Sequence, residues 1–194
     1  AVETLGSVDV ICSDKTGTLT ENRMTVTVID VAGQRLDLTE TLHKRQPEIA
    51  TGPLQPGSLG QISPAIRLTL VSGALCNDAT LKPDADGRSL HAIGDPTEGA
   101  LVVAAAHAGL LKDDLQAAMP RVAEFAFDSD RKRMTTVHRV PAAGGSAGLL
   151  PPLGDWSHMA FSKGAVDGLL ELASQVWTAD KAEPMTADFP SRIL

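Results

Sequence analysis

An aspartate near the start of the chain is followed by residues suited to phosphate chemistry. Asp14 comes directly after the apolar run 8–12, which the pattern predicts to be a buried strand. A carboxylate at the carboxyl end of such a strand can attack a γ-phosphate and hold it as an acyl phosphate. Lys15 supplies a cation, Thr16 a hydroxyl, and Gly17 lets backbone N–H groups turn toward phosphate oxygens. Judged by residue types alone, a solvated turn explains the segment equally well.

Three further places carry residue types that suit a nucleotide. Phe127 offers a ring for a base to stack on, with Lys132 to meet the base or a phosphate; the alternative is a core phenylalanine before a charged turn. Lys163 is followed by a glycine, so a ligand could approach the backbone closely and meet the lysine; the alternative is an exposed lysine at a strand end. Glu98 stands three residues after the helix cap Asp95, where a capping box explains it without a ligand.

Hydrophobic periodicity and turn residues predict the elements that position these side chains. Strands are predicted at 24–31, 34–38, 90–93, 122–127, 134–140 and 158–162, and helices at 64–75, 94–108, 113–119 and 166–173. The segments 39–61 and 141–157 are rich in Gly and Pro and are predicted to be loops. The predicted fold class is α+β, an antiparallel β-sheet flanked by helices and entered from one strand of a different, parallel domain.

Composition narrows the class of protein. The chain has 194 residues, a net charge of −7 and no basic cluster, which argues against nucleic acid or anionic lipid as a partner. Cys12 and Cys76 lie far apart and are predicted to be reduced core thiols of a cytosolic protein. The longest apolar run, 99–111, is too short to cross a bilayer. Without an initiating Met, and with Ile193-Leu194 at its end, the chain is expected to be an excised piece of a longer protein.

The seven residues 14–20, Asp-Lys-Thr-Gly-Thr-Leu-Thr, resemble the signature of the P-type ATPases. This resemblance implies that Asp14 is phosphorylated by ATP in an intact pump, with Lys15 and Thr16 beside it and Mg²⁺ held by Asp14 and Thr16. The loop is also similar to that of haloacid dehalogenase-like (HAD-like) phosphatases, which carry a second aspartate where this chain has Thr16. Because threonine does not shuttle protons at neutral pH, the acyl phosphate is expected to persist.

Later segments resemble motifs of type II pumps in the same order along the chain. The motif at 95–98 implies that a glutamate accepts from the adenine amino group, the one at 125–134 that a phenylalanine packs on adenine, and the one at 161–165 that a lysine lines the adenosine pocket. Ser129 replaces an arginine that contacts phosphate in a calcium pump of the family, so Arg131 or Arg133 is left to compensate. The segment 75–79 resembles a structural motif. The resemblance implies ATP binding by Glu98, Phe127, Lys132, Lys163 and Arg192.

These motifs imply two domains and an incomplete enzyme. Residues 1–22 are expected to begin a phosphorylation domain of HAD-like type, and residues 23–194 to form a nucleotide-binding domain. The implied function is ATP binding in a cation-transporting pump, on the cytoplasmic side of a membrane, for Ca²⁺ or a related cation. Its partners are the rest of the phosphorylation domain and the actuator and transmembrane domains. Since the other pump motifs and a Walker A loop are missing, the chain is expected to bind ATP without turning it over.

Two other functions remain open at this stage. A stand-alone HAD-like phosphatase or phosphotransferase built around Asp14 needs a second carboxylate nearby and a complete parallel sheet, and the sequence offers neither in recognisable form. A non-catalytic interaction domain, indicated by the helix cap at Asp95 and the acidic surface, predicts no nucleotide preference.

Overall fold

The computed structural model describes residues 24–31, 33–38, 49–50, 62–83, 89–140, 156–178, 181–186 and 189 of the 194. The predictions for Asp14, Lys15, Thr16 and Arg192, and the domain boundary at residue 22, lie outside these residues. The described strands are β1 (Val28–Val31), β2 (Gln34–Asp37), β3 (Ile49–Ala50), β4 (Thr80–Pro83), β5 (Ser89–Ile93), β6 (Arg121–Asp128), β7 (Arg133–Arg139), β8 (His158–Gly164), β9 (Gln175–Thr178) and β10 (Lys181–Pro184). The described helices are α3 (Pro64–Leu75), α4 (Pro96–His107), α5 (Lys112–Ala118) and α6 (Val166–Leu170).

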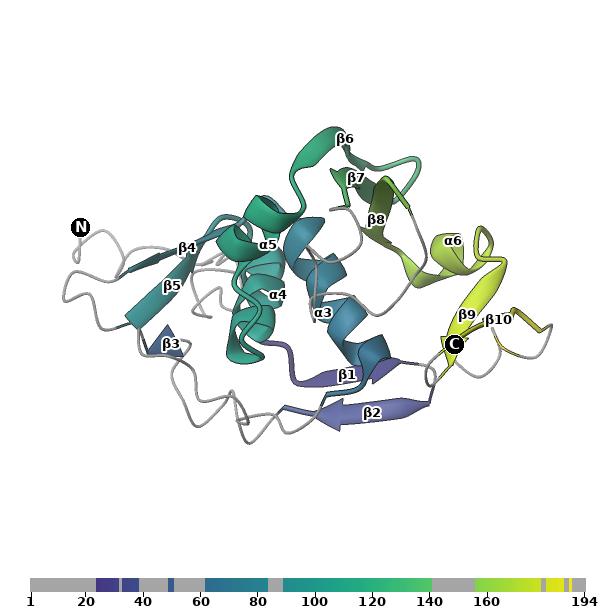
Figure 1. Cartoon of the computed structure of the whole chain (residues 1–194), viewed down its shortest axis with the longest axis horizontal. Coiled ribbons are helices and arrows are strands. Elements are labelled where there is room, and N and C mark those ends of the chain that lie inside the picture. Colours follow the sequence, from purple (N-terminus) through teal and green to yellow (C-terminus); the bar gives the residue numbers. More distant parts are fainter. Residues whose placement is uncertain are drawn as a thin grey trace, which may run out of the picture.

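Helix α3 lies at the centre of the molecule (Figure 1). It begins where the sequence predicts, because Ser63 accepts a hydrogen bond from the Ile66 N–H and Pro64 occupies the first turn. Its buried side chains contact α4 and α5 on one side and β1 and β8 on the other. The core is mostly aliphatic, as expected from the scarcity of aromatic residues, and it includes Phe161 and the buried free thiol of Cys76.

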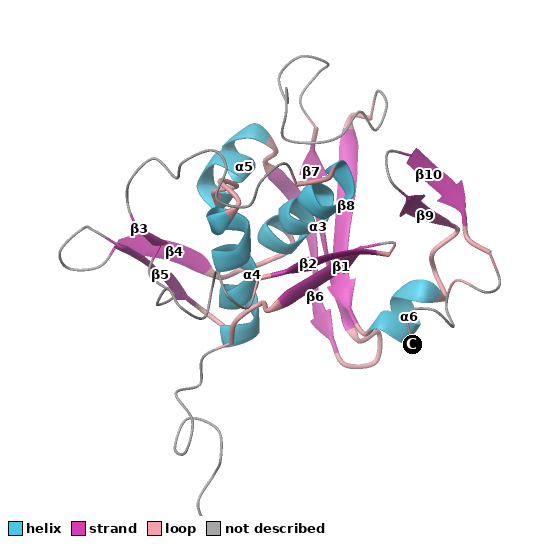
Figure 2. Ribbon diagram, turned by 90° about the horizontal axis from the view of Figure 1, so that it is seen from below, coloured by secondary structure: helices cyan, strands magenta, loops and turns pink. Residues whose placement is uncertain are grey.

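The sheet that matters for the site has the strand order β6-β7-β8 and is antiparallel throughout. On β7 the side chains of Met134, Thr136 and His138 are buried, and they alternate with partly exposed neighbours. The register pairs Met134 with Lys163 and Thr136 with Phe161, which places these β8 residues on the same face. This buried face lies against α3 (Figure 2).

Several predicted elements differ from the structure. The single predicted sheet is wrong, because the described strands form four small antiparallel sheets. Strand β3 lies within the predicted loop 39–61 and pairs with β5, while β4, β9 and β10 were not predicted. Pro83 and Pro184 end short polar strands that lack a clear apolar alternation, which explains why the sequence pattern does not predict β4 and β10. Helix α6 ends at Leu170 rather than 173 and buries none of its side chains, although its apolar residues repeat at helical spacing.

No helix among the described residues is long and apolar enough to cross a membrane.

His138 lies fully buried between β7 and the end of α5. Its Nδ1 lies 2.9 Å from the carbonyl of Met119, which can only accept, so Nδ1 carries the proton. Its Nε2 lies 3.0 Å from the Thr136 hydroxyl, which therefore donates to it. Burial, and then the positive charge of Arg121, hold the pKa of His138 below its ordinary value.

We therefore expect the stability of the chain to fall as the pH drops below about 6.5. In that window the unfolded chain has bound a proton on this histidine and the folded chain has not, so the free energy of unfolding declines by up to about 1.4 kcal/mol per pH unit. The decline ends below the folded pKa, and stability is fully retained above about pH 6.5. Urea unfolding at a series of pH values measures this slope. His138→Gln should reduce the slope, whereas substitution of the exposed His158 by Gln serves as the control and should leave it; an identical slope in all three proteins would contradict the assignment.

Candidate functional site

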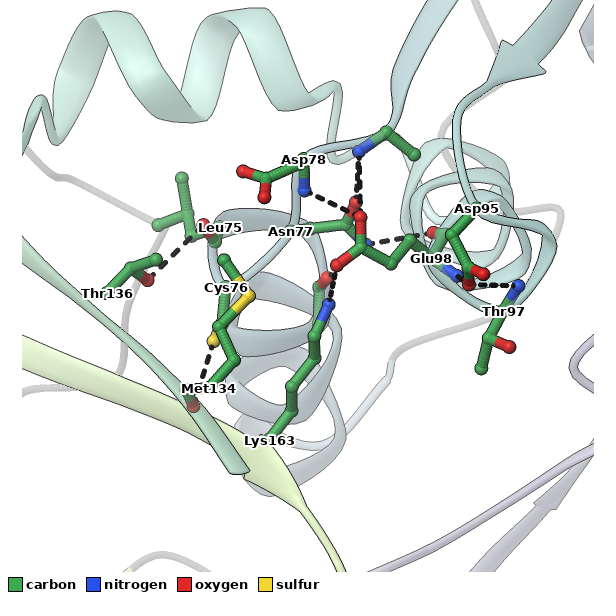
Figure 3. A network of polar contacts seen from close by, with 12 residues as sticks. Leu75, Cys76, Asn77, Asp78, Asp95, Thr97, Glu98, Met134, Thr136 and Lys163 are labelled. Atoms are coloured by element: carbon green, nitrogen blue, oxygen red, sulfur yellow. Dashed lines mark hydrogen bonds and ion pairs between the residues drawn. The ribbon is translucent and has the colours of Figure 1, made fainter. Parts of the chain in front are cut away.

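Glu98 lies in the first turn of α4 and reaches away from its own helix. Asp95 caps this helix as predicted, since its Oδ1 accepts from the N–H groups of Thr97 (2.9 Å) and Glu98 (3.2 Å). The predicted return contact of a capping box is wrong. The Oε2 atom of Glu98 instead accepts from the N–H groups of Asp78 (2.9 Å) and Ala79 (3.2 Å), in the segment that follows α3 (Figure 3).

Lys163, at the end of β8, forms an ion pair with the Oε1 atom of Glu98 (Figure 3). The two side chains are 25% and 17% exposed respectively, so the pair is partly shielded from water yet still accessible. Because Oε2 already receives two donors, the remaining lone pair of the carboxylate is on Oε1. Lys163 has further N–H groups beside it. A ligand therefore meets a hydrogen-bond donor and an acceptor side by side.

The fully buried Asn77 fixes the segment that binds Glu98. Its Nδ2 donates to the carbonyls of Gly73 (3.0 Å) and Glu98 (2.8 Å), and its Oδ1 accepts from the Ala79 N–H (2.8 Å). Gly94, at φ +133°, allows the chain to enter α4 close to this segment, since a Cβ there would lie 2.9 Å from the Cα of Ala79. The sequence 75–79 was predicted to be structural, and these contacts confirm that role.

Two cations hold the same segment from the other side. The Nζ of Lys112 donates to the carbonyls of Asn77 and Ala79, both at 2.6 Å, and Arg121 Nη2 donates to the Asn77 carbonyl at 2.6 Å. Lys112 is only 4% exposed, and burial lowers its pKa. Sequence reasoning missed both residues. The run Lys-Asp-Asp at 112–114 is typical of a solvated helix start, and the only hint was a lysine following the apolar pair Leu110-Leu111.

Phe127 lies on β6 and is 65% exposed, so the alternative of a core phenylalanine is wrong. A register shift between Phe125 and Asp128 introduces one extra residue on β6. Since Asp128 pairs with Arg133, the residue before it falls on the opposite face, in the row of Met134 and Lys163. Phe127 thus shares a sheet face with Lys163, without a cation–π contact between them in the described part of the chain.

Lys132 lies in the turn between β6 and β7, with an exposed side chain and a left-handed backbone (φ +50°). Its carbonyl accepts from the Ala165 N–H at 3.0 Å, which ties the turn to the end of β8. Asp128 closes the turn, and its pKa is lowered chiefly by the Arg131 N–H that it accepts at 2.8 Å. The Arg131 guanidinium is bonded to the Ala126 carbonyl (2.9 Å). Lys132 therefore lies beside the backbone that carries Lys163, without contacting Glu98.

The structure thus joins two of the predicted site residues directly, Glu98 and Lys163, and places Phe127 and Lys132 on the adjoining hairpin. Within the described ranges there is no group of three or more His, Cys, Asp or Glu side chains that could hold a metal ion. The predicted Mg²⁺ ligands, Asp14 and Thr16, fall outside those ranges, so that site stays a prediction.

Comparison with known proteins gives a consistent result. Residues 65–194 match the family model described as "P-type ATPase, cytoplasmic domain N". The chain is 38% identical over 182 residues to a probable cation-transporting ATPase F of Mycobacterium tuberculosis, covering 94% of this chain and 18% of that protein. It is 37% identical over 194 residues to calcium-transporting ATPase 1 of Bacillus cereus, covering 100% of this chain and 18% of that protein. It is also 35% identical over 175 residues to mouse calcium-transporting ATPase type 2C member 1, covering 88% and 16%. The chain therefore spans less than a fifth of the length of these relatives.

Proposed function

This chain belongs to the P-type ATPases and matches their cytoplasmic domain N, and from that premise we propose that it binds ATP through the pair Glu98–Lys163 and the ring of Phe127. The single observation that carries the proposal is the ion pair, which places a free acceptor lone pair next to cationic donors.

Adenine is complementary to this arrangement. Its exocyclic amino group donates and the neighbouring ring nitrogen accepts, so the first suits Glu98 Oε1 and the second suits Lys163 Nζ. Guanine presents the opposite pattern, a carbonyl acceptor beside an N–H donor, and would set its oxygen against the carboxylate. The exposed ring of Phe127, on the same face of the sheet, supplies a surface on which the base can stack. These residues therefore fit adenine better than guanine.

For the intact protein we propose a cation pump, in which ATP bound here phosphorylates Asp14. Asp14 and Thr16 would hold Mg²⁺, which would supply positive charge to offset that of the phosphate, and Lys15 would neutralise further charge on the phosphate. Lys132 and Arg192 would contact the nucleotide. The remaining phosphorylation, actuator and transmembrane domains would complete the enzyme and place this domain on the cytoplasmic side of a membrane, with Ca²⁺ or a related cation as the ion carried.

We expect ATP added to the 194-residue chain to shift the amide resonances of Glu98, Phe127 and Lys163. Phe127→Ala removes the stacking surface and should weaken ATP binding by roughly tenfold, because stacking on an aromatic ring contributes about 1–3 kcal/mol per base to the binding free energy. Phe125→Ala is the matched control, because Phe125 is 56% exposed but pairs with Thr135 on the other face of the sheet. Chemical-shift titrations give both affinities. Equal losses in the two variants, or no shifts around the three residues, would argue against this site.

The two alternative functions make different predictions. A phosphatase built on Asp14 would release phosphate from a small phosphomonoester, and Asp14→Asn would abolish the release. An interaction domain would show no preference between ATP and GTP.

A further inference from the structure

A single peptide group, between Asn77 and Asp78, connects the buried Lys112 and the partly exposed Arg121 to the carboxylate of Glu98. We propose that Lys112 and Arg121 are positioning residues for recognition of the adenine amino group, and that they act through this peptide group on Glu98. The inference rests on the proposed function and extends it to residues that do not touch the nucleotide.

The geometry of the peptide carries the first step. A peptide unit is planar, and its carbonyl and N–H point in opposite directions. Here the Asn77 carbonyl is held at 2.6 Å by Lys112 Nζ and at 2.6 Å by Arg121 Nη2, while the Asp78 N–H of the same unit donates to Glu98 Oε2 at 2.9 Å. The unit cannot rotate without breaking both cationic contacts. The two cations therefore fix the direction in which the Asp78 N–H meets Glu98.

Charge carries the second step. Two charge-assisted donors on one carbonyl polarise the peptide and strengthen the hydrogen bond that its N–H donates. Burying an ammonium group is unfavourable unless it is well hydrogen-bonded, and Lys112 Nζ donates to the carbonyls of Asn77 and Ala79 rather than to a carboxylate. A buried hydrophobic residue would fill this place at lower cost if only packing were needed. The positive charge of Lys112 is therefore explained by the peptide that it orients.

Holding Oε2 in this way determines what Oε1 can do. With Oε2 occupied by the N–H groups of Asp78 and Ala79, and Lys163 on Oε1, a single acceptor position of Glu98 remains for a ligand. If Lys112 is removed, the peptide gains freedom and the carboxylate loses its fixed direction. Contacts to the 6-amino group of adenine should weaken, whereas stacking and phosphate contacts should not.

The test compares ATP with purine riboside 5′-triphosphate, which differs by lacking the 6-amino group. We expect the wild-type chain to bind ATP about tenfold more tightly, the effect of one hydrogen bond to a charged group. Lys112→Met keeps the unbranched side chain, one atom shorter, and removes its charge. It should lose most of this preference, by weakening ATP about tenfold while changing purine riboside triphosphate by less than about twofold. Lys82→Met, at an exposed position of β4, controls for the change in net charge and should keep the preference.

Each outcome decides a different point. If Lys112→Met weakens both ligands equally, or keeps the preference for ATP, the positioning role is wrong and the proposed function stands. If the wild-type chain shows no preference, the contact between Glu98 and the amino group is itself wrong, and the inference falls with it. Should circular dichroism show that Lys112→Met does not fold, Arg121→Met is judged by the same two affinities. Arg121 is the better tolerated site, since its side chain is 20% exposed.

Discussion

Gly164→Ala is expected to destabilise the chain by about 3 kcal/mol, the upper part of the range for overpacked sites. A Cβ on residue 164 would lie 2.2 Å from the carbonyl oxygen of Lys132, 2.6 Å from the Cβ of Arg133 and 2.8 Å from its Cα. Two of these three atoms belong to the backbone, so no side-chain rotation relieves the contact. The strands β7 and β8 must move apart at this point, or the turn before β7 must change its conformation.

The same change should also weaken nucleotide binding. Lys163 immediately precedes the substituted residue. Ala165 immediately follows it, and the Ala165 N–H donates a hydrogen bond to the Lys132 carbonyl. Displacing this backbone moves the lysine away from Glu98 and loosens the turn that carries Lys132. Denaturant unfolding and an ATP titration of the same variant measure the two effects together.

Gly168→Ala is the matched control for this substitution. Gly168 lies in α6, and a Cβ there would meet nothing within 4 Å, so alanine should be neutral or stabilise the helix by up to about 1 kcal/mol. If Gly164→Ala were as stable as Gly168→Ala, the close approach of β8 to the turn would not exist in solution.

Asn77→Ala is the second substitution with a large expected effect, also about 3 kcal/mol. It removes three hydrogen bonds made by a fully buried side chain, two donated to the carbonyls of Gly73 and Glu98 and one accepted from Ala79. Each bond contributes about 1 kcal/mol, and the buried groups left without a partner add a further cost. Thermal or urea unfolding measures the loss.

The neighbouring Asp78→Ala provides the comparison. Its side chain is 59% exposed and pairs with Arg121 at 2.8 Å, so losing it should cost less than about 1 kcal/mol. The Asp78 N–H that binds Glu98 is a backbone group and remains. A similar loss of stability in both variants would mean that the contacts of the buried amide contribute little.

Local patterns predicted the elements that surround the site better than the arrangement of its sheets. Helix α3 follows from a Ser-Pro start and an apolar repeat, and α4 from the Asp95 cap, because both signals act within a few residues. Strand β3 pairs with β5 across a long stretch of chain, so no local window of sequence contains its partner. Strands β4 and β10 pair with strands that are close in sequence, but their short polar sequences carry no apolar alternation that would mark them as strands. The apolar repeat at 166–173 predicted a packed face, yet Val166 is exposed.

The sequence predicted the site residues whose side chains would contact a ligand. It did not predict the residues whose side chains bind backbone groups. Glu98 and Lys163 were expected in one pocket through resemblance to known motifs, and the structure joins them. Their residue types alone allowed a capping box and an exposed strand end. Lys112 and Arg121 bind carbonyl groups, which every residue carries, so no pattern of side chains marks their targets. Contacts between a side chain and distant backbone appear only once the fold is known.

The ion pair between Glu98 and Lys163 links the start of α4 to the end of β8, two places separated by 65 positions along the chain. Its supporting contacts come from the segment after α3, from α5 and from β6. The site therefore forms only when these segments, which are distant in sequence, have reached their folded positions. Any nucleotide that binds here associates with the completed fold alone, and by mass action it draws the folding equilibrium toward that state. Ligand binding and folding of the domain are thereby linked, so the amount of nucleotide bound at saturation also measures the fraction of folded molecules.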